Sequence, residues 1–256
     1  MAANSAGQAG HRVPKWRWMV AALWAATLGG CGSSATINFR FIVEIDDNGV
    51  TRSGSSVWQF KISENLDRTS YSPEFHGEAV AVDLPGRGTL FVLPSDLGTD
   101  LQIVAEKLFR QEAEAVAGRS ATRHALNRAI GRMIGAAKPV PCSKVRGASK
   151  PLSWADDFCP GMVRFRNPDD PASVEAVEIG NLESAFGPGV RIKGFAVEIT
   201  DADVTTGIEQ RLPWLPDYAR RQVHLTNRPV HSTSYNTPLA ERLGTGAFST
   251  ENRNVR

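Results

Sequence analysis

The chain has 256 residues, of which 41% are hydrophobic and 22% are charged, and this length and composition suit one globular domain with a substantial core. The formal net charge of +2 overstates its basic character, because three bases and no acid stand before Cys31. The chain from Cys31 onward carries 26 of the 29 bases and all 27 acids. A domain this close to neutral gives no general electrostatic case for nucleic-acid binding, and we predict no nucleic-acid partner.

The N-terminus has the organisation of a secretory signal. A basic segment at 11–17 precedes the apolar run Trp18–Leu28, which has the length of a signal-peptide core. The adjoining residues Leu28-Gly29-Gly30-Cys31 resemble the lipobox of bacterial lipoproteins. The resemblance implies cleavage before Cys31 and attachment of lipid to that cysteine. Residues 1–30 are therefore expected to be a lipoprotein signal peptide and residues 31–36 a tether, with membrane lipid as the partner held through Cys31.

The alternative is an uncleaved transmembrane helix over 18–37 in the inner membrane. No charged residue occurs from Trp18 to Phe39, and about 20 apolar residues span a bilayer. The run is weakly apolar at its end, which favours the lipoprotein. In both cases the basic flank stays in the cytoplasm, so the domain faces the periplasm or the exterior of the cell envelope. The residue after Cys31 is Gly32. In enteric bacteria an Asp at this position is linked to inner-membrane retention, and by analogy its replacement with Gly favours the outer membrane.

The first part of the domain predicts β-strands, because apolar and polar residues alternate there. The turn Asp46-Asp47-Asn48-Gly49 joins the first two strands as a hairpin. Gly54 is expected to mark a bulge in the second strand, and the polar segment Ser63–His76 a loop. The four strands, which we expect to form an antiparallel meander, are Ile37–Asp46, Val50–Ile62, Gly77–Leu84 and Thr89–Leu93.

The pattern then changes to apolar residues at every third or fourth position, which predicts helices. Two are expected, at about 97–117 and 120–136, with Ser120 as the N-cap of the second and their apolar faces against the sheet. The elements predicted further on are strands at Met162–Arg166, Val174–Ile179 and Val190–Thr200, and short helices at Leu182–Phe186 and Asp203–Leu212. The prediction is a single α+β domain over 37–218, with antiparallel strands packed against a helical pair at 97–136, and a polar, disordered tail over 219–256.

Four segments also resemble those of a family of uncharacterised bacterial proteins and lipoproteins. They are SGSSV (53–57), GEAVAVDLPGRGTLF (77–91), FGPGVRIKGFAVEIT (186–200) and TTGIEQRLPWLP (205–216). The resemblance covers most of residues 38–216. It implies a common fold and implies no activity.

Cys142 and Cys159 are the only cysteines after Cys31. Outside the cytoplasm, an even pair in a loop-rich region predicts a disulfide bond. Two free thiols in a reducing compartment are the alternative. A redox role is not expected, because the pair lacks the Cys-x-x-Cys spacing.

The second predicted helix carries an unusual row of bases on its polar face: Arg119, Arg123, Arg128 and Arg132. Like charges at i,i+4 repel one another unless an anion lies near, and a lipid-anchored domain has anionic head groups available. One hypothesis is that this face contacts an anionic membrane surface or an acidic envelope partner. The alternative is a solvated face whose arginines pair with acids of the preceding helix, namely Glu106, Glu112 and Glu114.

No motif in the sequence defines a catalytic or metal site. His76, Glu78 and Asp83 are polar residues around a predicted strand, and their spacing is not that of a zinc site. The serines beside Gly54, which are Ser53, Ser55 and Ser56, lack the second glycine of a nucleophile elbow. His124 is expected to be exposed on its helix, and His224 and His231 to lie in the tail.

We therefore predict no catalytic residues, no metal and no cofactor, and a membrane-anchored envelope lipoprotein with a non-enzymatic structural or binding role. A protein of the cell envelope is a candidate partner. The alternative is a secreted, hydrolase-like enzyme whose catalytic residues are dispersed in the sequence.

Overall fold

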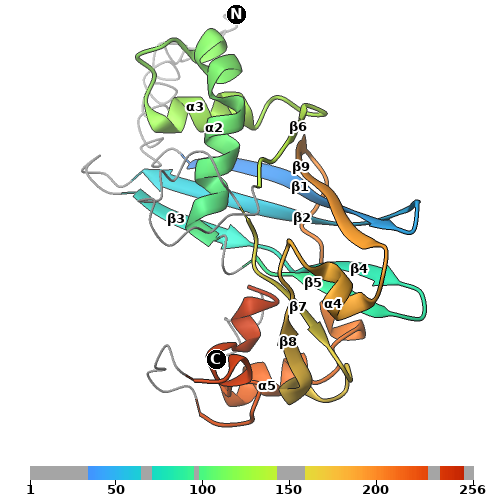
Figure 1. The fold of residues 1–256 in the computed structure, drawn as a ribbon. Coiled ribbons are helices and arrows are strands. Elements are labelled where there is room, and N and C mark those ends of the chain that lie inside the picture. Colours follow the sequence, from blue (N-terminus) through green and yellow to red (C-terminus); the bar gives the residue numbers. More distant parts are fainter. Residues whose placement is uncertain (1–33, 65–70, 95–97, 143–158, 230–236, 251–256) are drawn as a thin grey trace, which may run out of the picture. The chain divides into compact units, whose positions relative to one another are not determined.

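The computed structural model describes residues 34–64, 71–94, 98–142, 159–229 and 237–250 (Figure 1). These residues belong to one compact unit, 34–256, and form a single α+β domain with antiparallel sheets, as predicted. The predicted signal peptide, Cys31 and His231 lie outside the described residues.

A five-stranded antiparallel sheet is the largest element of the fold, with the strand order β3-β2-β1-β9-β6. Its strands are β1 Ser34–Asp47, β2 Val50–Glu64, β3 Tyr71–His76, β6 Ala137–Pro139 and β9 Val190–Thr200. The predicted hairpin of β1 and β2 is confirmed, and Asn48 and Gly49 make its turn with φ of 53° and 86°. β1 begins within the predicted tether, and it contains residues 34–37 of the alternative transmembrane helix. The predicted loop Ser63–His76 is wrong at both ends, since β2 continues to Glu64 and β3 pairs with it.

Only one face of this sheet is apolar, because the strands alternate between buried and partly exposed residues. In β1 the buried positions are Ala35, Ile37, Phe39, Phe41, Val43 and Ile45. Phe39 lies opposite Trp58 of β2 and opposite Ile199 of β9, and all three are buried. Directly opposite residues of antiparallel strands share a face, so these side chains form one continuous layer of the main core.

A second, four-stranded antiparallel sheet has the strand order β4-β5-β7-β8. Its strands are β4 Val80–Leu84, β5 Gly88–Val92, β7 Met162–Phe165 and β8 Val174–Ala176. The predicted meander is therefore divided between two sheets. Leu90 and Val92 point into the main core, whereas Phe91 and Leu93 belong to a second core, so this sheet is buried on both faces.

Gly54 lies where the two sheets come together, and it does not form the predicted bulge. The β1–β2 register runs through Gly54 without a shift, with Val43 opposite it. A Cβ at Gly54 would overlap the carbonyl oxygen of Ala81 in β4. The missing side chain therefore allows β4 to approach β2. The irregularity in this sheet lies instead between Glu44 and Ile45, where β1 pairs with β9.

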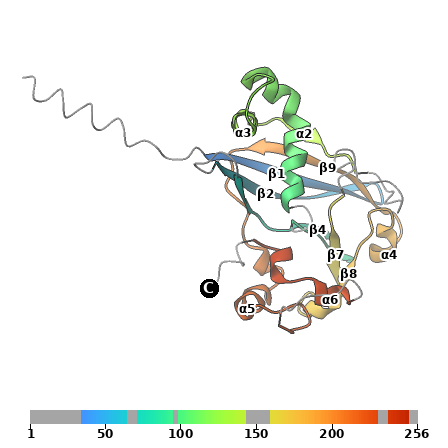
Figure 2. The same cartoon turned by 90° about the vertical axis from the view of Figure 1, so that its left-hand side faces the viewer.

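The predicted helical pair is confirmed as α2 Gly98–Ala117 and α3 Arg123–Ile130. α3 packs against β1 (Figure 2) and α2 contacts β3. The main core includes Phe109 and Ala113 of α2 and Ile130 of α3. The second helix is shorter than predicted. Its N-cap is Thr122 rather than Ser120, and the Thr122 Oγ1 accepts a hydrogen bond of 3.2 Å from the Ala125 N–H.

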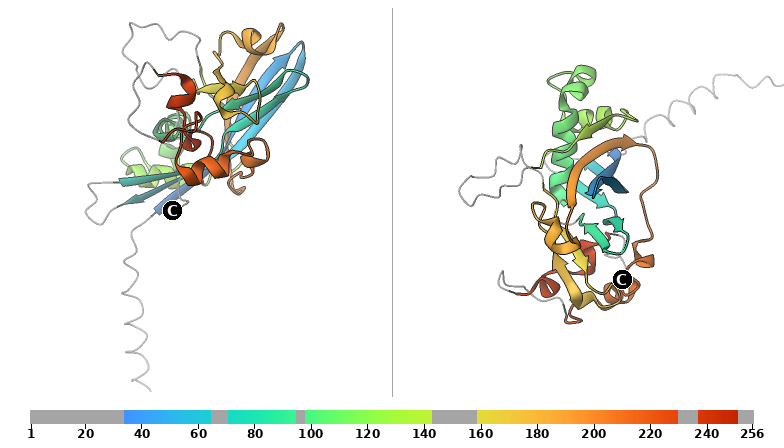
Figure 3. Two further views of the ribbon diagram at one scale, coloured as in Figure 1. Left: turned by 90° about the horizontal axis from the view of Figure 1, so that it is seen from below. Right: turned by 45° about the vertical axis from the view of Figure 1, so that its right-hand side comes forward.

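Short helices of the C-terminal half cover the second face of the four-stranded sheet (Figure 3). They are η1 Pro171–Ser173, η2 Ile208–Gln210, α5 Leu215–Arg221, α6 Leu239–Arg242 and η3 Thr245–Ala247. The helix predicted at Leu182–Phe186 forms as α4, but it lies beside β9 and belongs to the main core. Of the helix predicted at 203–212, only η2 forms. The disordered tail predicted over 219–256 is also wrong for its described part, because Leu225 and Phe248 are fully buried in the second core.

Candidate functional site

The N-terminal end of the described chain lies beside the end of helix α3. β1 begins at Ser34, three residues after Cys31. A Cβ at Gly131, the residue after α3, would lie 2.8 Å from the carbonyl oxygen of Thr36. The Gly135 N–H donates a hydrogen bond of 2.8 Å to the carbonyl oxygen of Ile199, which holds the turn 131–135 on the same sheet. The helical pair and this turn, here called the helical hairpin, therefore stand next to the segment that leads to Cys31.

The four arginines predicted as an anionic contact do not share one environment. Arg123 is partly buried, and its Nε donates bonds of 2.8 and 3.1 Å to the two carboxylate oxygens of Glu106. The buried Asn127 donates a third bond, of 2.9 Å, to Glu106. Arg123 therefore joins α3 to α2 and belongs to the scaffold, as the solvated-face alternative expected for this pair.

The other three are Arg119, Arg128 and Arg132, here called the arginine surface. All three side chains are exposed, and within the described part of the chain no ion pair involves them. The acids that the alternative assigned to them have other partners: Glu112 pairs with Lys138, and Glu114 with Arg110 at 3.3 Å. The pairing alternative is therefore wrong for these two acids.

The helical hairpin also exposes two large apolar side chains that sequence reasoning missed. Val116, at the end of α2, is 73% exposed, and Ile134, in the turn after α3, is 51% exposed. Among the residues whose side-chain burial the structure describes, Val50 is the other large hydrophobic residue with such exposure. Ile134 lies inside the helix predicted over 120–136, whereas α3 ends at Ile130 and Ile134 stands in the turn that follows.

His124 is buried rather than exposed, with 3% of its surface accessible. It lies one turn before Asn127 and two before Ile130, on the side of α3 that faces inward. Neither ring nitrogen has a hydrogen-bond partner in the described part of the chain. His224 is likewise buried, and its backbone N–H donates to the Arg228 carbonyl oxygen at 2.8 Å, so it belongs to the folded C-terminal layer.

The polar residues around β4 are structural in their contacts. Glu78 is buried, and its carboxylate accepts bonds from the Ile208 N–H at 2.9 Å and the Ser249 hydroxyl at 3.3 Å. Burial raises the pKa of Glu78 above its ordinary 4.5, with the Ile208 bond opposing this. Asp83 binds the Arg211 guanidinium through both oxygens, at 2.5 and 2.8 Å. Within the described ranges, no three His, Cys, Asp or Glu side chains lie together as metal ligands would.

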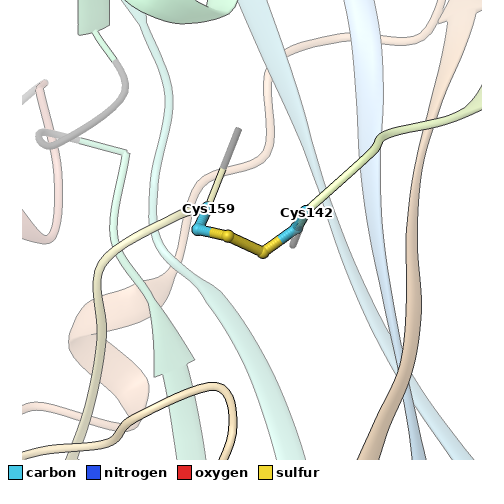
Figure 4. The surroundings of a disulfide bond; sticks show 2 residues. All are labelled: Cys142 and Cys159. Carbon is cyan, nitrogen blue, oxygen red and sulfur yellow. A yellow bond between two sulfur atoms is a disulfide. The ribbon is translucent and has the colours of Figure 1, made fainter. Parts of the chain in front are cut away.

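The predicted disulfide bond between Cys142 and Cys159 is confirmed (Figure 4). Their Cα atoms are 5.0 Å apart, within the ordinary range for a disulfide. The bond joins the segment that follows β6 to the segment that precedes β7, and so it connects the edge of the five-stranded sheet to the four-stranded sheet.

Comparison with protein-family models, with curated proteins and with solved structures gave no match from which a family could be assigned. In the part of the chain that the structure describes, no helix is long and apolar enough to cross a membrane.

Proposed function

We propose that this chain is a lipid-anchored protein of the bacterial cell envelope, attached through Cys31, whose folded unit has a binding or structural role outside the cytoplasm. The observation that carries the proposal is the disulfide bond between Cys142 and Cys159. Structural disulfides persist in oxidising compartments and are rare in the cytosol. This agrees with the compartment to which the lipobox-like segment would direct the chain, and the two observations are independent.

The position of the helical hairpin supports a membrane role for two residues of the arginine surface, Arg128 and Arg132. Thr36, which Gly131 contacts, is five residues after Cys31, so fully extended chain places that cysteine at most about 17 Å away. Arg132 is adjacent to Gly131, and Arg128 lies one helical turn earlier. Near an anionic bilayer each such base contributes about 1 kcal/mol, and Ile134 adds an apolar contact beside them. Lipid at Cys31 would thus bring this surface to the head groups.

The anchor and the disulfide are tested together by the intact mass of the protein purified from bacterial membranes, before and after reduction. We expect a mass that lacks residues 1–30, carries acyl chains and increases by two protons on reduction. An unmodified full-length mass would rule out the lipid anchor. A mass unchanged by reduction would place the folded unit in a reducing compartment.

The membrane contact is tested with the acylated protein in vesicles, with a fluorophore on Ile134→Cys and brominated lipids as quenchers. We expect quenching in vesicles that contain phosphatidylglycerol, and little in phosphatidylcholine alone. Arg128→Glu with Arg132→Glu should abolish it, and salt should weaken it. Arg220→Glu with Arg242→Glu, which reverses two exposed arginines of α5 and α6 and so changes the net charge equally, is the matched control. Equal quenching in all variants would contradict the contact. Arg123 is left unchanged because its ion pair holds the hairpin together.

A further inference from the structure

A pocket of about 320 Å³ opens between strands β5 and β7 of the four-stranded sheet. Three arginines and three apolar residues are among the residues that line it, and none of the described lining residues is acidic. A volume near the lower end of the range for ligand pockets suits a small organic molecule. The arginines are Arg87, Arg164 and Arg166, and the apolar residues are Phe91, Phe165 and Pro168, of which Phe91 and Phe165 also belong to the second core.

The pocket exists because β5 and β7 separate after two paired positions. Their register includes Phe91 opposite Val163 and Val92 opposite Met162, although β5 begins at Gly88 and β7 ends at Phe165. The Leu93 N–H donates to the Gly161 carbonyl oxygen at 2.9 Å, so alternate residues of β5 direct their backbone groups toward β7. By this alternation the backbone of Thr89 faces the gap, and it adds polar groups to the pocket wall.

Positive charge around the pocket is only partly compensated. Arg164 and Arg166 share one carboxylate, that of Glu175, at 2.7 and 3.0 Å. Arg87 shares Asp47 with Arg52, at 3.6 and 3.9 Å. Each carboxylate therefore pairs with two guanidinium groups, and each group of one acid and two arginines keeps a net positive charge.

Two of the three guanidinium groups are also fixed in position before any ligand arrives. Arg87 donates a bond of 2.8 Å from Nη1 to the Phe186 carbonyl oxygen. The Arg164 guanidinium lies 5.7 Å from the centre of the Phe186 ring. The Arg164 Nε and Nη2 already bond Glu175, at 2.8 and 2.7 Å, so its remaining N–H groups are the ones open to a ligand. Guanidinium groups fixed in this way bind carboxylate and phosphate oxygens with little loss of side-chain entropy.

We propose that this pocket binds a small organic anion, namely a carboxylate or phosphate ester carried on a flat apolar group. The guanidinium groups of Arg87, Arg164 and Arg166 bind the anionic oxygens, and Phe91, Phe165 and Pro168 cover the apolar part. The site is built from the four-stranded sheet and does not depend on the membrane role proposed for the helical hairpin.

The test is isothermal titration of the full chain in detergent micelles with phenyl phosphate and with benzoate, and with benzyl alcohol as the neutral analogue. We expect saturable binding of at least one anion, weaker binding in high salt and none of benzyl alcohol. Arg166→Gln should weaken the binding about tenfold, as expected for the loss of one charge-assisted contact. Arg191→Gln is the matched control, because Arg191 is 73% exposed and pairs with one glutamate, Glu183, but does not line the pocket.

Arg166→Gln is expected to fold, since this side chain is 69% exposed and Glu175 keeps Arg164 as its partner. A circular dichroism spectrum and a thermal transition equal to those of the parent chain verify this. If neither anion binds, or if Arg166→Gln and Arg191→Gln bind equally well, the pocket is not an anion site. If benzyl alcohol binds as tightly as the anions, the apolar residues are the site and the proposed role of the arginines is wrong.

Discussion

Gly54 shows at the scale of one residue how the two sheets come together. The position lies inside β2, with no bulge and no positive φ, so its backbone conformation does not require glycine. What requires it is the carbonyl group of Ala81, which occupies the place of a Cβ. A glycine inside a strand pattern indicates either a bulge or a close approach of another chain segment, and the sequence alone does not distinguish them.

Gly54→Ala is therefore expected to destabilise the domain by about 1–3 kcal/mol, the usual cost of overpacking a core. The free energy of unfolding in urea, monitored by tryptophan fluorescence, measures the change. Gly194→Ala is the matched control, because Gly194 lies in β9 and a Cβ added there would have no neighbouring atom within 4 Å. Its effect should be within about 0.5 kcal/mol. Equal effects of the two substitutions would show that the contact with Ala81 is not what limits position 54.

Glu78 makes the unfolding free energy of the domain depend on pH, and the burial of its carboxylate sets the sign of that dependence. Its pKa in the folded domain is raised above the ordinary 4.5 by desolvation, so the folded state favours the protonated form. The stability it contributes is full below pH 4.5 and is lost as the pH rises through the folded-state pKa. Glu78→Gln should remove this dependence and leave a flatter curve of unfolding free energy above pH 4.5.

Asp83 should affect the unfolding free energy in the opposite sense to Glu78, because the Arg211 guanidinium lowers the pKa of Asp83 below its ordinary 3.8. Its contribution is present above that value and is lost as the pH falls through the lower folded-state pKa. The side chain is 54% exposed, so solvent screening limits the effect to about 1 kcal/mol or less. If Glu78→Gln leaves the pH curve of the parent chain unchanged, another group controls it.

At the scale of elements, the strands that sequence reasoning located best are those buried on one face only. β1, β2 and β9 lie in the interior of the five-stranded sheet, where buried residues alternate with more exposed ones over most of each strand, and β9 forms over the predicted residues Val190–Thr200. The two missed strands, β3 and β6, are its edges. Both are short and contain proline, as edge strands tolerate, and so neither carries an alternating apolar pattern.

The disulfide bond is the covalent link between these elements, and its loss should have a measurable cost. Closing a loop of this length, with a sequence separation of 17 between the cysteines, stabilises a domain by about 3 kcal/mol. Cys142→Ser with Cys159→Ser is expected to lower the unfolding free energy by that amount while the far-ultraviolet circular dichroism is retained. Reduction of the parent chain should reproduce the loss and should not affect the double variant. A parent chain whose urea midpoint is insensitive to reductant would contradict this.

At the scale of the whole molecule, the described unit contains two cores that share the four-stranded sheet. Sequence reasoning found the first, since periodic strands and helices build it. It missed the second, because the residues after 218 are apolar only at scattered positions such as Leu225 and Phe248. The pocket arginines were missed for a related reason, since Arg87 and Arg164 come together only through the pairing of distant strands.

Phe248 is the centre of that second core, and it provides the sharpest test of whether the C-terminal segment is part of the domain. Its ring contacts those of Phe165 and Trp214 at centroid distances of 5.6 and 5.9 Å. The backbone beside it is held as well, because the Ala79 N–H donates to the Phe248 carbonyl oxygen at 2.7 Å. A residue with these contacts is integral to the sheet on which it packs.

Phe248→Ala should therefore lower the unfolding free energy by about 3–5 kcal/mol, the usual cost of removing a buried aromatic side chain. Urea unfolding followed by tryptophan fluorescence measures it, and Trp214 reports directly on this core. Val50→Ala, at a side chain that is 50% exposed, is the control and should cost less than about 1 kcal/mol. If the C-terminal segment were not part of the domain, Phe248→Ala and Val50→Ala would lower the unfolding free energy by the same small amount. A selective loss of the Trp214 signal, with the strands of the main core retained, would instead show that the two cores unfold as separate cooperative units.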